Sequence, residues 1–139
     1  MRIAHVASTR TNCMKRAVGA VIVKDCRIVS TGYNGTPFNT KNCNQGGCAR
    51  CNSNASSGVG LDECICIHAE ENAVIEGGRA NTMGGTCYVT TFPCLMCAKN
   101  LVQAGIKRIV YDREYPLPIV FKFIGNCEGV EIERHQVQF

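Results

Sequence analysis

The chain has 139 residues, of which 45% are hydrophobic and 19% charged, and its formal net charge at pH 7 is +4. A chain of this length and balance can bury a core without disulfide bonds, so we expect a single domain over residues 1–139. No apolar run approaches the roughly 20 residues of a membrane helix, and the 15 Lys and Arg residues are dispersed rather than clustered. These features argue against a membrane or nucleic-acid partner and favour a small anionic ligand.

The N-terminal residues and the cysteine content indicate the compartment. Residues 1–12 lack the apolar core of a secretion signal, so we expect an intracellular, cytoplasmic protein. The chain contains 11 cysteines, several of them in closely spaced pairs. In a reducing compartment such cysteines indicate metal binding rather than a disulfide framework, because thiolates are good ligands for zinc.

Hydrophobic patterning predicts strands that alternate with helices. The runs 18–23 and 27–31, separated by the turn residue Asp25, predict an antiparallel hairpin. Residues 68–75 have helical spacing and are followed by the stop signal Gly77-Gly78. Further along the chain we expect strands at 86–91, 108–111 and 130–134, and helices at 95–104 and 118–124. This order predicts a three-layer α/β/α domain with a mixed central sheet of about five strands.

The region from residue 32 to about residue 63 departs from this pattern. It is composed mainly of Gly, Asn, Thr, Ser and Cys and shows little periodicity. An irregular stretch of this length is improbable in a compact domain unless something holds it in place. We therefore interpret residues from about 38 to 66 as a Cys-rich insertion that a metal ion orders.

Two short segments, HAE at 68–70 and PCLMC at 93–97, carry residues suited to catalysis. Alone, a His at a helix start is more often structural, and a C-x-x-C pair is also found in redox and structural zinc sites. Together, His68, Cys94 and Cys97 provide three metal ligands. Three protein ligands leave zinc an open fourth position for water, which is typical of a catalytic site.

Glu70 is placed to move protons at this site. The helix N-termini favour thiolates and other anions near the metal. From the first turn of its helix, Glu70 can reach past His68 toward the open coordination position. Zinc lowers the pKa of bound water to about 7, so Glu70 could take that proton as a general base and pass it to a leaving amine as a general acid.

An H-x-E motif followed by P-C-x-x-C is the signature of the zinc-dependent nucleobase deaminases. Within that superfamily the chain resembles the deoxycytidylate (dCMP) deaminase family over nearly its whole length. The segments that carry the resemblance are Val18-Gly-Ala-Val-Ile, Gly32-Tyr-Asn-Gly-Thr-Pro37, His68-Ala-Glu-Glu-Asn-Ala73, Tyr88-Val-Thr-Thr-Phe-Pro-Cys94 and Gln103-Ala-Gly-Ile-Lys107.

The resemblance implies a cytidine-deaminase-like fold and a hydrolytic reaction. Zinc would be held by His68, Cys94 and Cys97, with Glu70 as general acid and base. The reaction would convert dCMP to dUMP and ammonia, which supplies dUMP for thymidylate synthesis.

The resemblance also implies contacts with the bound nucleotide. Asn34 would contact the sugar 3′-hydroxyl, although Asn and Gly also favour such a turn without any function. Tyr115 has a plain alternative interpretation as a half-buried aromatic residue. Phe92 could line the base pocket, but we expect it to be a core aromatic. The full set of expected substrate-binding residues is Asn34, Ala69, Glu70, Asn72 and Tyr115.

Family members commonly form homohexamers and are regulated through the Gly-Tyr-Asn-Gly loop, with dCTP as activator and dTTP as inhibitor. The resemblance therefore implies a homo-oligomer and these effectors, and we would expect Mg²⁺ to accompany an allosteric nucleotide. The family often has Gly two residues after the Pro, whereas this chain has Asn39. Close approach of the backbone to a triphosphate is then less assured, so regulation stays open.

Six further cysteines lie before the catalytic His and around the insertion: Cys13, Cys43, Cys48, Cys51, Cys64 and Cys66. Any one of them could be a small buried hydrophobe, but six together favour a second, closed zinc site. Some family members carry a structural zinc whose ligands match Cys13, Cys43 and Cys66. Either Cys48 or Cys51 would complete the four, and Cys64 is a spare candidate.

The remaining cysteines, Cys26, Cys87 and Cys127, lie in or beside predicted strands and a helix end, where we expect core packing. Three alternative functions stay open. The first is deamination of dCTP or cytidine, and the second is deamination of adenosine in transfer RNA, which the Gly-Tyr-Asn-Gly-Thr-Pro loop and the lack of a basic surface disfavour. The third is a zinc-organised binding module, although a closed structural site has no use for Glu70.

Overall fold

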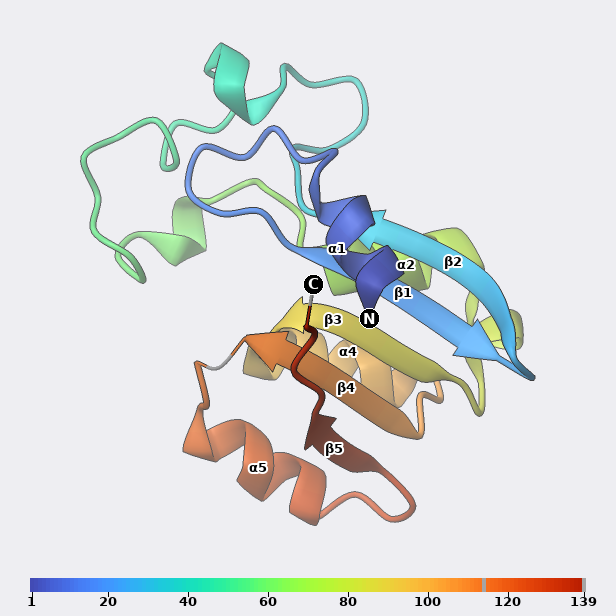
Figure 1. The fold of residues 1–139 in the computed structure, drawn as a ribbon. Helices are drawn as coiled ribbons and strands as arrows, with labels where there is room; N and C mark the ends of the chain where they lie inside the picture. The colour runs from blue at the N-terminus through green and yellow to red at the C-terminus, as the bar shows by residue number, and fades with distance from the viewer. Residues whose placement is uncertain (114, 139) are drawn as a thin grey trace.

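A five-stranded sheet forms the centre of the structure, a computed structural model that describes residues 1–113 and 115–138. The strand order is β2-β1-β3-β4-β5 (Figure 1). β1 (Gly19–Lys24) is antiparallel to β2 (Arg27–Tyr33) and to β3 (Thr86–Thr91). β4 (Arg108–Arg113) is parallel to β3, and β5 (Glu131–Arg134) is parallel to β4. The predicted mixed sheet of about five strands is confirmed.

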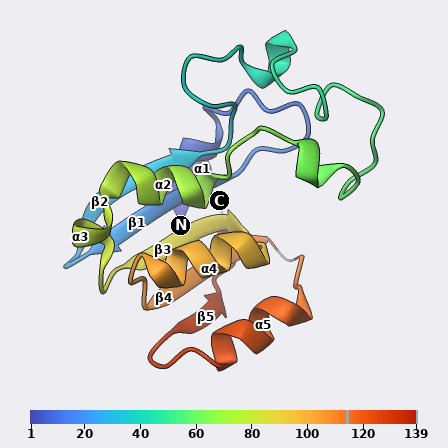
Figure 2. The ribbon, with the colours of Figure 1, turned by 180° about the vertical axis from the view of Figure 1, so that it is seen from behind.

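Helices lie on both faces of the sheet (Figure 1, Figure 2). α1 (Arg2–Ser8) lies on one face. The opposite face carries α2 (Ala69–Gly77), α3 (Arg79–Thr82), α4 (Leu95–Gln103) and α5 (Pro118–Gly125). The short helix α3 was not predicted, because the sequence indicated a stop at Gly77-Gly78; Gly78 has a φ of +75°, and the chain turns there into a new helical segment. Within the described ranges, no helix has the length and apolarity needed to cross a membrane.

The β1–β2 hairpin turns at Asp25 and Cys26, whose φ angles are +52° and +63°. Two consecutive left-handed residues are typical of a type I′ turn, whose twist matches that of the strands it joins. The expectation that Cys26 packs in the core is wrong, because this residue occupies the turn and is exposed. Cys87 is buried as expected, and the partly buried Cys127 has its Sγ 3.3 Å from the Phe123 carbonyl oxygen.

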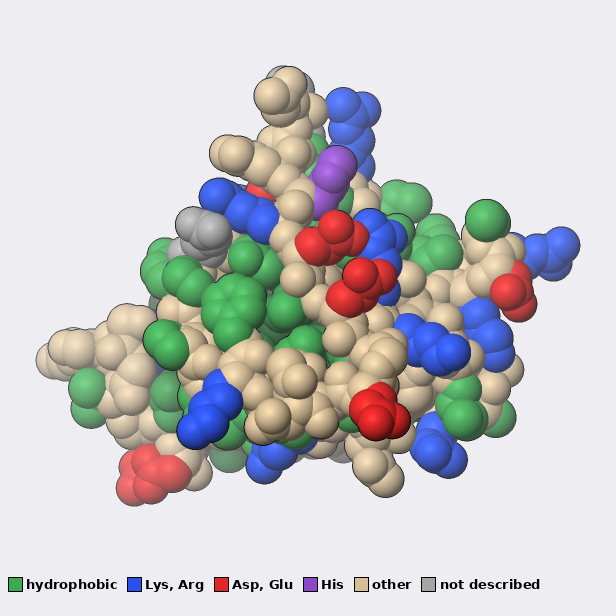
Figure 3. All heavy atoms as spheres, turned by 90° about the horizontal axis from the view of Figure 1, so that it is seen from below, with side chains coloured by type: hydrophobic (Ala, Val, Ile, Leu, Met, Phe, Trp, Pro, Cys, Tyr) green, Lys and Arg blue, Asp and Glu red, His purple; other side chains and the backbone are tan. Residues whose placement is uncertain are grey.

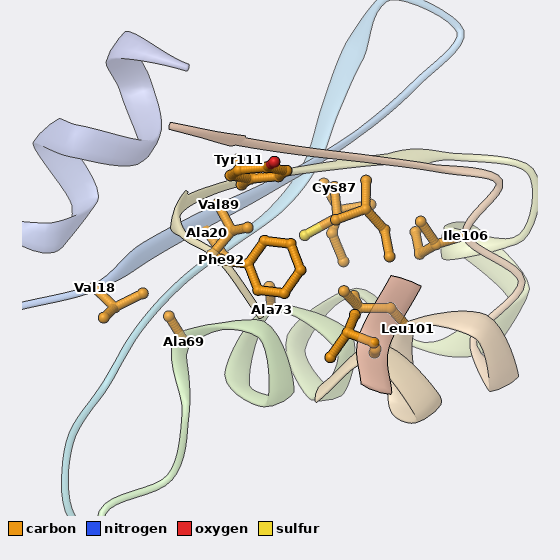
Figure 4. Packing of buried hydrophobic residues seen from close by; sticks show 14 of the residues in the cluster. Val18, Ala20, Ala69, Ala73, Cys87, Val89, Phe92, Leu101, Ile106 and Tyr111 are labelled. Atoms are coloured by element: carbon orange, nitrogen blue, oxygen red, sulfur yellow. The ribbon is translucent and has the colours of Figure 1, made fainter. Parts of the chain in front are cut away.

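The main core fills the space between the sheet and helices α2, α4 and α5 (Figure 4). Alternate residues of β1, β3 and β4 face this space, as expected for strands with one face on the core. Phe92 lies within it, with its ring centroid 4.8 Å from that of Tyr111 and 5.1 Å from that of Phe121. Phe92 is therefore a core aromatic, as predicted.

On the opposite face, one carboxylate of β4 contacts both ends of the chain. His5 Nε2 in α1 lies 2.6 Å from Asp112 Oδ2. The Val137 N–H donates to Asp112 Oδ1 at 3.4 Å. Asp112 thus links α1 and the C-terminal segment to the centre of the sheet.

α2 lies close against β2 because Gly32 has no side chain. A Cβ at Gly32 would lie 2.2 Å from the Ala69 carbonyl oxygen and 2.6 Å from the Ala73 nitrogen. Two residues earlier in β2, Ser30 Oγ donates to the Ala73 carbonyl oxygen at 2.7 Å. Gly32 and Ser30 together fix the position of the first turns of α2.

We predict that Gly32→Ala destabilises the fold, because the added methyl group would push the α2 backbone away from the sheet. The free energy of unfolding should fall by about 1–3 kcal/mol, measured by urea denaturation. Gly125→Ala is the matched control, because a Cβ there meets nothing within 4 Å. Equal effects of the two substitutions would show that the close approach at Gly32 does not matter.

Candidate metal centre and active site

Three possible metal ligands meet where α2 and α4 begin. His68 is the N-cap of α2, Cys94 is the N-cap of α4, and Cys97 lies in the first turn of α4. His68 Nδ1 lies 3.2 Å from Cys97 Sγ and 3.6 Å from Cys94 Sγ. The structure therefore brings together the three side chains that the sequence predicted as zinc ligands.

The spacing and chemistry of this trio fit zinc. In a tetrahedral zinc site, bonds of about 2.0 Å to nitrogen and about 2.3 Å to sulfur place the two ligand atoms roughly 3.6 Å apart. The two separations between His68 Nδ1 and the cysteine sulfurs are close to this value. Imidazole and thiolate are both preferred zinc ligands, and three side chains leave a fourth position free.

The backbone around His68 is held on both sides. Before His68, Ile67 and Gly35 form an antiparallel bridge, with N–H to carbonyl distances of 2.7 and 3.1 Å. After it, Glu71 Oε1 accepts the His68 N–H at 3.4 Å. Because Gly35 belongs to the Gly-Tyr-Asn-Gly loop, this bridge joins the loop directly to the metal-ligating segment.

Contacts within the trio shift the pKa values of all three side chains. Contact with Cys97, with a further contribution from His68, lowers the pKa of Cys94 to about 4. The Cys94 neighbour and burial raise the pKa of Cys97, and contact with Cys94 raises the pKa of His68. A bound metal ion would displace the protons of these three groups, because metal ligands must be deprotonated.

Glu70 lies in the first turn of α2 and is only 4% exposed. Burial raises the pKa of its carboxyl group, and the Glu70 backbone N–H and His68 oppose the shift. A buried carboxyl group with a raised pKa, close to three possible metal ligands, is a candidate for accepting and releasing a proton. The structure therefore brings Glu70 to the same site as the trio.

The side-chain amide of Asn34, directly after β2, bonds through both its oxygen and its nitrogen to the segment before β1. Its Oδ1 accepts the Val18 N–H, and its Nδ2 donates to the Arg16 carbonyl oxygen, both at 2.9 Å. The Asn34 side chain is buried. These bonds support a structural role that the sequence had suggested only as a turn preference, and they leave each amide atom one further hydrogen-bonding position.

The other expected substrate residues are Ala69, Asn72 and Tyr115. Ala69 is buried as the first residue of α2, and Asn72 Nδ2 donates to the Tyr33 carbonyl oxygen at 2.8 Å. Tyr115 is 66% exposed, so the half-buried alternative is wrong for this residue. The Arg16 guanidinium lies 5.9 Å from the centre of the Tyr115 ring. Sequence reasoning missed Arg16, whose only signal is a basic pair before the first strand.

A second cluster is formed by Cys13, which precedes the insertion, and the five cysteines within it. These six, together the insertion cysteines, are Cys13, Cys43, Cys48, Cys51, Cys64 and Cys66. Their sulfur atoms fall into two groups of four, and within each group all sulfurs lie within 4.8 Å of one another. The first group is Cys13, Cys43, Cys51 and Cys66, and the second is Cys48, Cys51, Cys64 and Cys66. The sequence left the fourth ligand of a structural zinc open, and the structure brings all six cysteines together.

Asn39 has a φ of +63°. This is the left-handed conformation that glycine adopts at no steric cost. Asn39 therefore provides the backbone conformation at the position where the family often has Gly.

A family model for the cytidine and deoxycytidylate deaminase zinc-binding region matches residues 1–113. Two curated relatives, the deoxycytidylate deaminases of Schizosaccharomyces pombe and Saccharomyces cerevisiae, are 45% and 50% identical over 136 residues each. The matches cover 97% and 96% of this chain, but only 42% and 43% of the two relatives. The chain thus spans less than half the length of these relatives.

A solved structure of similar fold is that of dCMP deaminase from the cyanophage S-TIM5 in complex with dCMP and dUMP. It matches with a TM-score of 0.74 and 30% sequence identity, over 96% of this chain and 92% of that chain.

We predict that Asn34→Asp weakens folding. One carboxylate oxygen would still accept the Val18 N–H, but the other would face the Arg16 carbonyl oxygen with no proton between them. The free energy of unfolding should fall by about 1–3 kcal/mol, measured by urea denaturation. Asn54→Asp introduces the same charge at an exposed position and is the control. Unchanged stability together with a raised KM would instead assign Asn34 to substrate binding alone.

Proposed function

Because the chain belongs to the cytidine and deoxycytidylate deaminase family, we propose that it hydrolyses the 4-amino group of dCMP, releasing dUMP and ammonia. The observation that carries the proposal is the buried Glu70 beside His68, Cys94 and Cys97. The names of the fungal relatives and the nucleotides bound to the cyanophage enzyme support dCMP as the substrate. The product would supply dUMP for thymidylate synthesis, and the deaminase-type domain would occupy residues 1–139.

In this proposal His68, Cys94 and Cys97 hold the catalytic zinc. When bound, zinc supplies Lewis-acid activation of water, which makes attack on the pyrimidine ring possible near neutral pH. The α2 and α4 N-termini at the site add partial positive charge, which stabilises the thiolates.

Glu70 carries the protons between the reactants. Its carboxylate takes a proton from the water that attacks C4, and the protonated carboxyl then delivers a proton to the departing amine, so that ammonia leaves. The raised pKa of Glu70 supports the second half of this cycle, because it makes the protonated carboxyl easier to retain until the amine departs.

Arg16 favours a phosphorylated substrate over a nucleoside. It is exposed, lies over Tyr115, and its carbonyl is bonded to Asn34. We therefore propose that Arg16 faces the nucleotide phosphate, while Asn34, Ala69, Asn72 and Tyr115 surround the sugar and base. Arginine suits this role because its planar guanidinium can bond phosphate oxygens in pairs.

The insertion cysteines are proposed to hold structural zinc, separate from the catalytic ion. The support is the clustering of six sulfur atoms drawn from four segments of the chain. Thiols that bind zinc must stay reduced, so an intracellular, cytoplasmic location is part of the proposal.

Homo-oligomer formation, with a hexamer as the expected form, is also part of the proposal. Its support is an apolar surface on and before α5, where Leu117, Ile119 and Phe121 are exposed. Figure 3 shows hydrophobic side chains gathered on the face of the molecule that includes this helix. We also propose that dCTP and dTTP, together with Mg²⁺, act as effectors. The support for this proposal is the left-handed backbone at Asn39.

We predict that the purified protein converts dCMP to dUMP at least tenfold more efficiently than it converts deoxycytidine or cytidine, because a nucleoside offers no phosphate to Arg16. Loss of the ultraviolet absorption of cytosine measures each rate. Adenosine and dCTP complete the panel. Equal kcat/KM for nucleoside and monophosphate would contradict dCMP as the substrate while leaving deamination intact.

We predict that Glu70→Gln lowers kcat by at least roughly 10²–10⁴, the range typical of a lost general acid or base. KM should change less, because a proton shuttle acts mainly in the transition state. The catalytic zinc should be retained, since Glu70 is not one of the three ligands. Glu76→Gln, an exposed position on the same helix, is the control and should keep normal turnover. Loss of zinc from Glu70→Gln would make Glu70 a ligand or its support.

A further inference from the structure

We infer that the insertion cysteines hold two zinc ions, not one, and that Cys51 and Cys66 bridge the two ions. The inference extends the structural zinc proposed above and is independent of the substrate. The first ion would also be bound by Cys13 and Cys43, and the second ion would also be bound by Cys48 and Cys64.

The grouping of the sulfur atoms carries the inference. Each group of four sulfurs is compact enough for one tetrahedral ion, and the two groups share Cys51 and Cys66. Two tetrahedral ions need eight metal–sulfur bonds. Six thiolates supply eight bonds when two of them bridge, so the six cysteines fill both sites with none left over.

The distances within the cluster agree with this arrangement. Two thiolates on one tetrahedral zinc lie roughly 3.8 Å apart, given bonds of about 2.3 Å. Cys51 Sγ lies 3.9 Å from Cys13 Sγ, 3.7 Å from Cys64 Sγ and 3.9 Å from Cys66 Sγ. Cys51 therefore contacts both outer pairs, as a bridging ligand must.

The second outer pair has the same spacing. Cys48 Sγ lies 3.7 Å from Cys64 Sγ, and Cys48 is fully buried. A single ion on the first group would leave these two sulfurs packed together without a ligand role.

The interior of the insertion contains these thiols and the buried Arg50, whose guanidinium donates to the carbonyl oxygens of Ser56 and Val59. In residues 36–66, all of which the structure describes, the buried hydrophobic side chains are Cys43, Cys48 and Cys51. The large apolar residues of this segment point outward, and Phe38 is 93% exposed. Without an apolar core, metal binding is the available source of folding free energy.

The two ions would hold different parts of the chain. The first joins the segment before β1, through Cys13, to the start of the insertion at Cys43. The second closes the insertion between Cys48 and Cys64. Both use Cys66, two residues before His68, so both would fix the segment that carries the catalytic imidazole.

Native mass spectrometry and elemental analysis of the full chain test the count. We expect three zinc ions per chain, one catalytic and two in the insertion. The double substitution Cys48→Ser/Cys64→Ser should lower the count to two, because Cys13, Cys43, Cys51 and Cys66 can still hold one ion. The control Cys127→Ser lies outside both groups and should keep three.

A count of two in the unmodified chain would overturn the shared cluster and leave a single structural zinc. A count of one would remove the structural zinc altogether, and dCMP turnover would report separately on the catalytic site.

Cadmium substitution tests the bridges without any variant. The ¹¹³Cd spectrum of the unmodified chain should show two tetrathiolate resonances, split by coupling through the shared sulfurs, besides the signal of the catalytic ion. One unsplit tetrathiolate resonance would overturn the inference even if the zinc count were ambiguous.

Discussion

The contact between Gly32 of β2 and the backbone of α2 is the constraint on which the site depends. It lets the helix approach the sheet closely enough for the helix start to meet the start of α4, so that His68 Nδ1 lies 3.2 Å from Cys97 Sγ. The same placement buries Glu70 in the first turn of α2. A single missing side chain in β2 thus allows the start of α2 to bring His68 and Glu70 to the possible metal ligands of α4.

Local patterns made most of the fold predictable. The hairpin, the strands at β3 and β4 and the helices α2 and α4 follow from periodicity and from Gly stop signals, which act within a few residues. The strand order and the His5–Asp112 pair join residues far apart in sequence, and no local pattern encodes such contacts. Cys26 shows the same limit, because a type I′ turn placed it in solvent.

The meeting of His68, Cys94 and Cys97 was predictable because their two motifs are short and chemically distinctive. Asn34 was harder, because an Asn-Gly turn is common and gives no sign that both amide atoms bond to the segment before β1. Arg16 carried no signal beyond its charge. The number of insertion cysteines can be read from the sequence, whereas the sharing of Cys51 and Cys66 between two groups depends on how the loop folds back on itself.

The constraints on sequence variation differ between a segment held together by cysteines and an apolar core. Around α4, a change of one methylene alters packing. Between Cys51 and Cys64 most side chains are exposed, although Asn52 Nδ2 donates to the carbonyl oxygens of Cys43 and Cys48. The entropy of closing such a loop grows only slowly with its length. Residues 54–63 should therefore vary more freely in sequence and length while the six cysteines and Asn52 stay fixed, which makes this stretch a natural place to graft a peptide without disturbing the site at His68, Cys94 and Cys97.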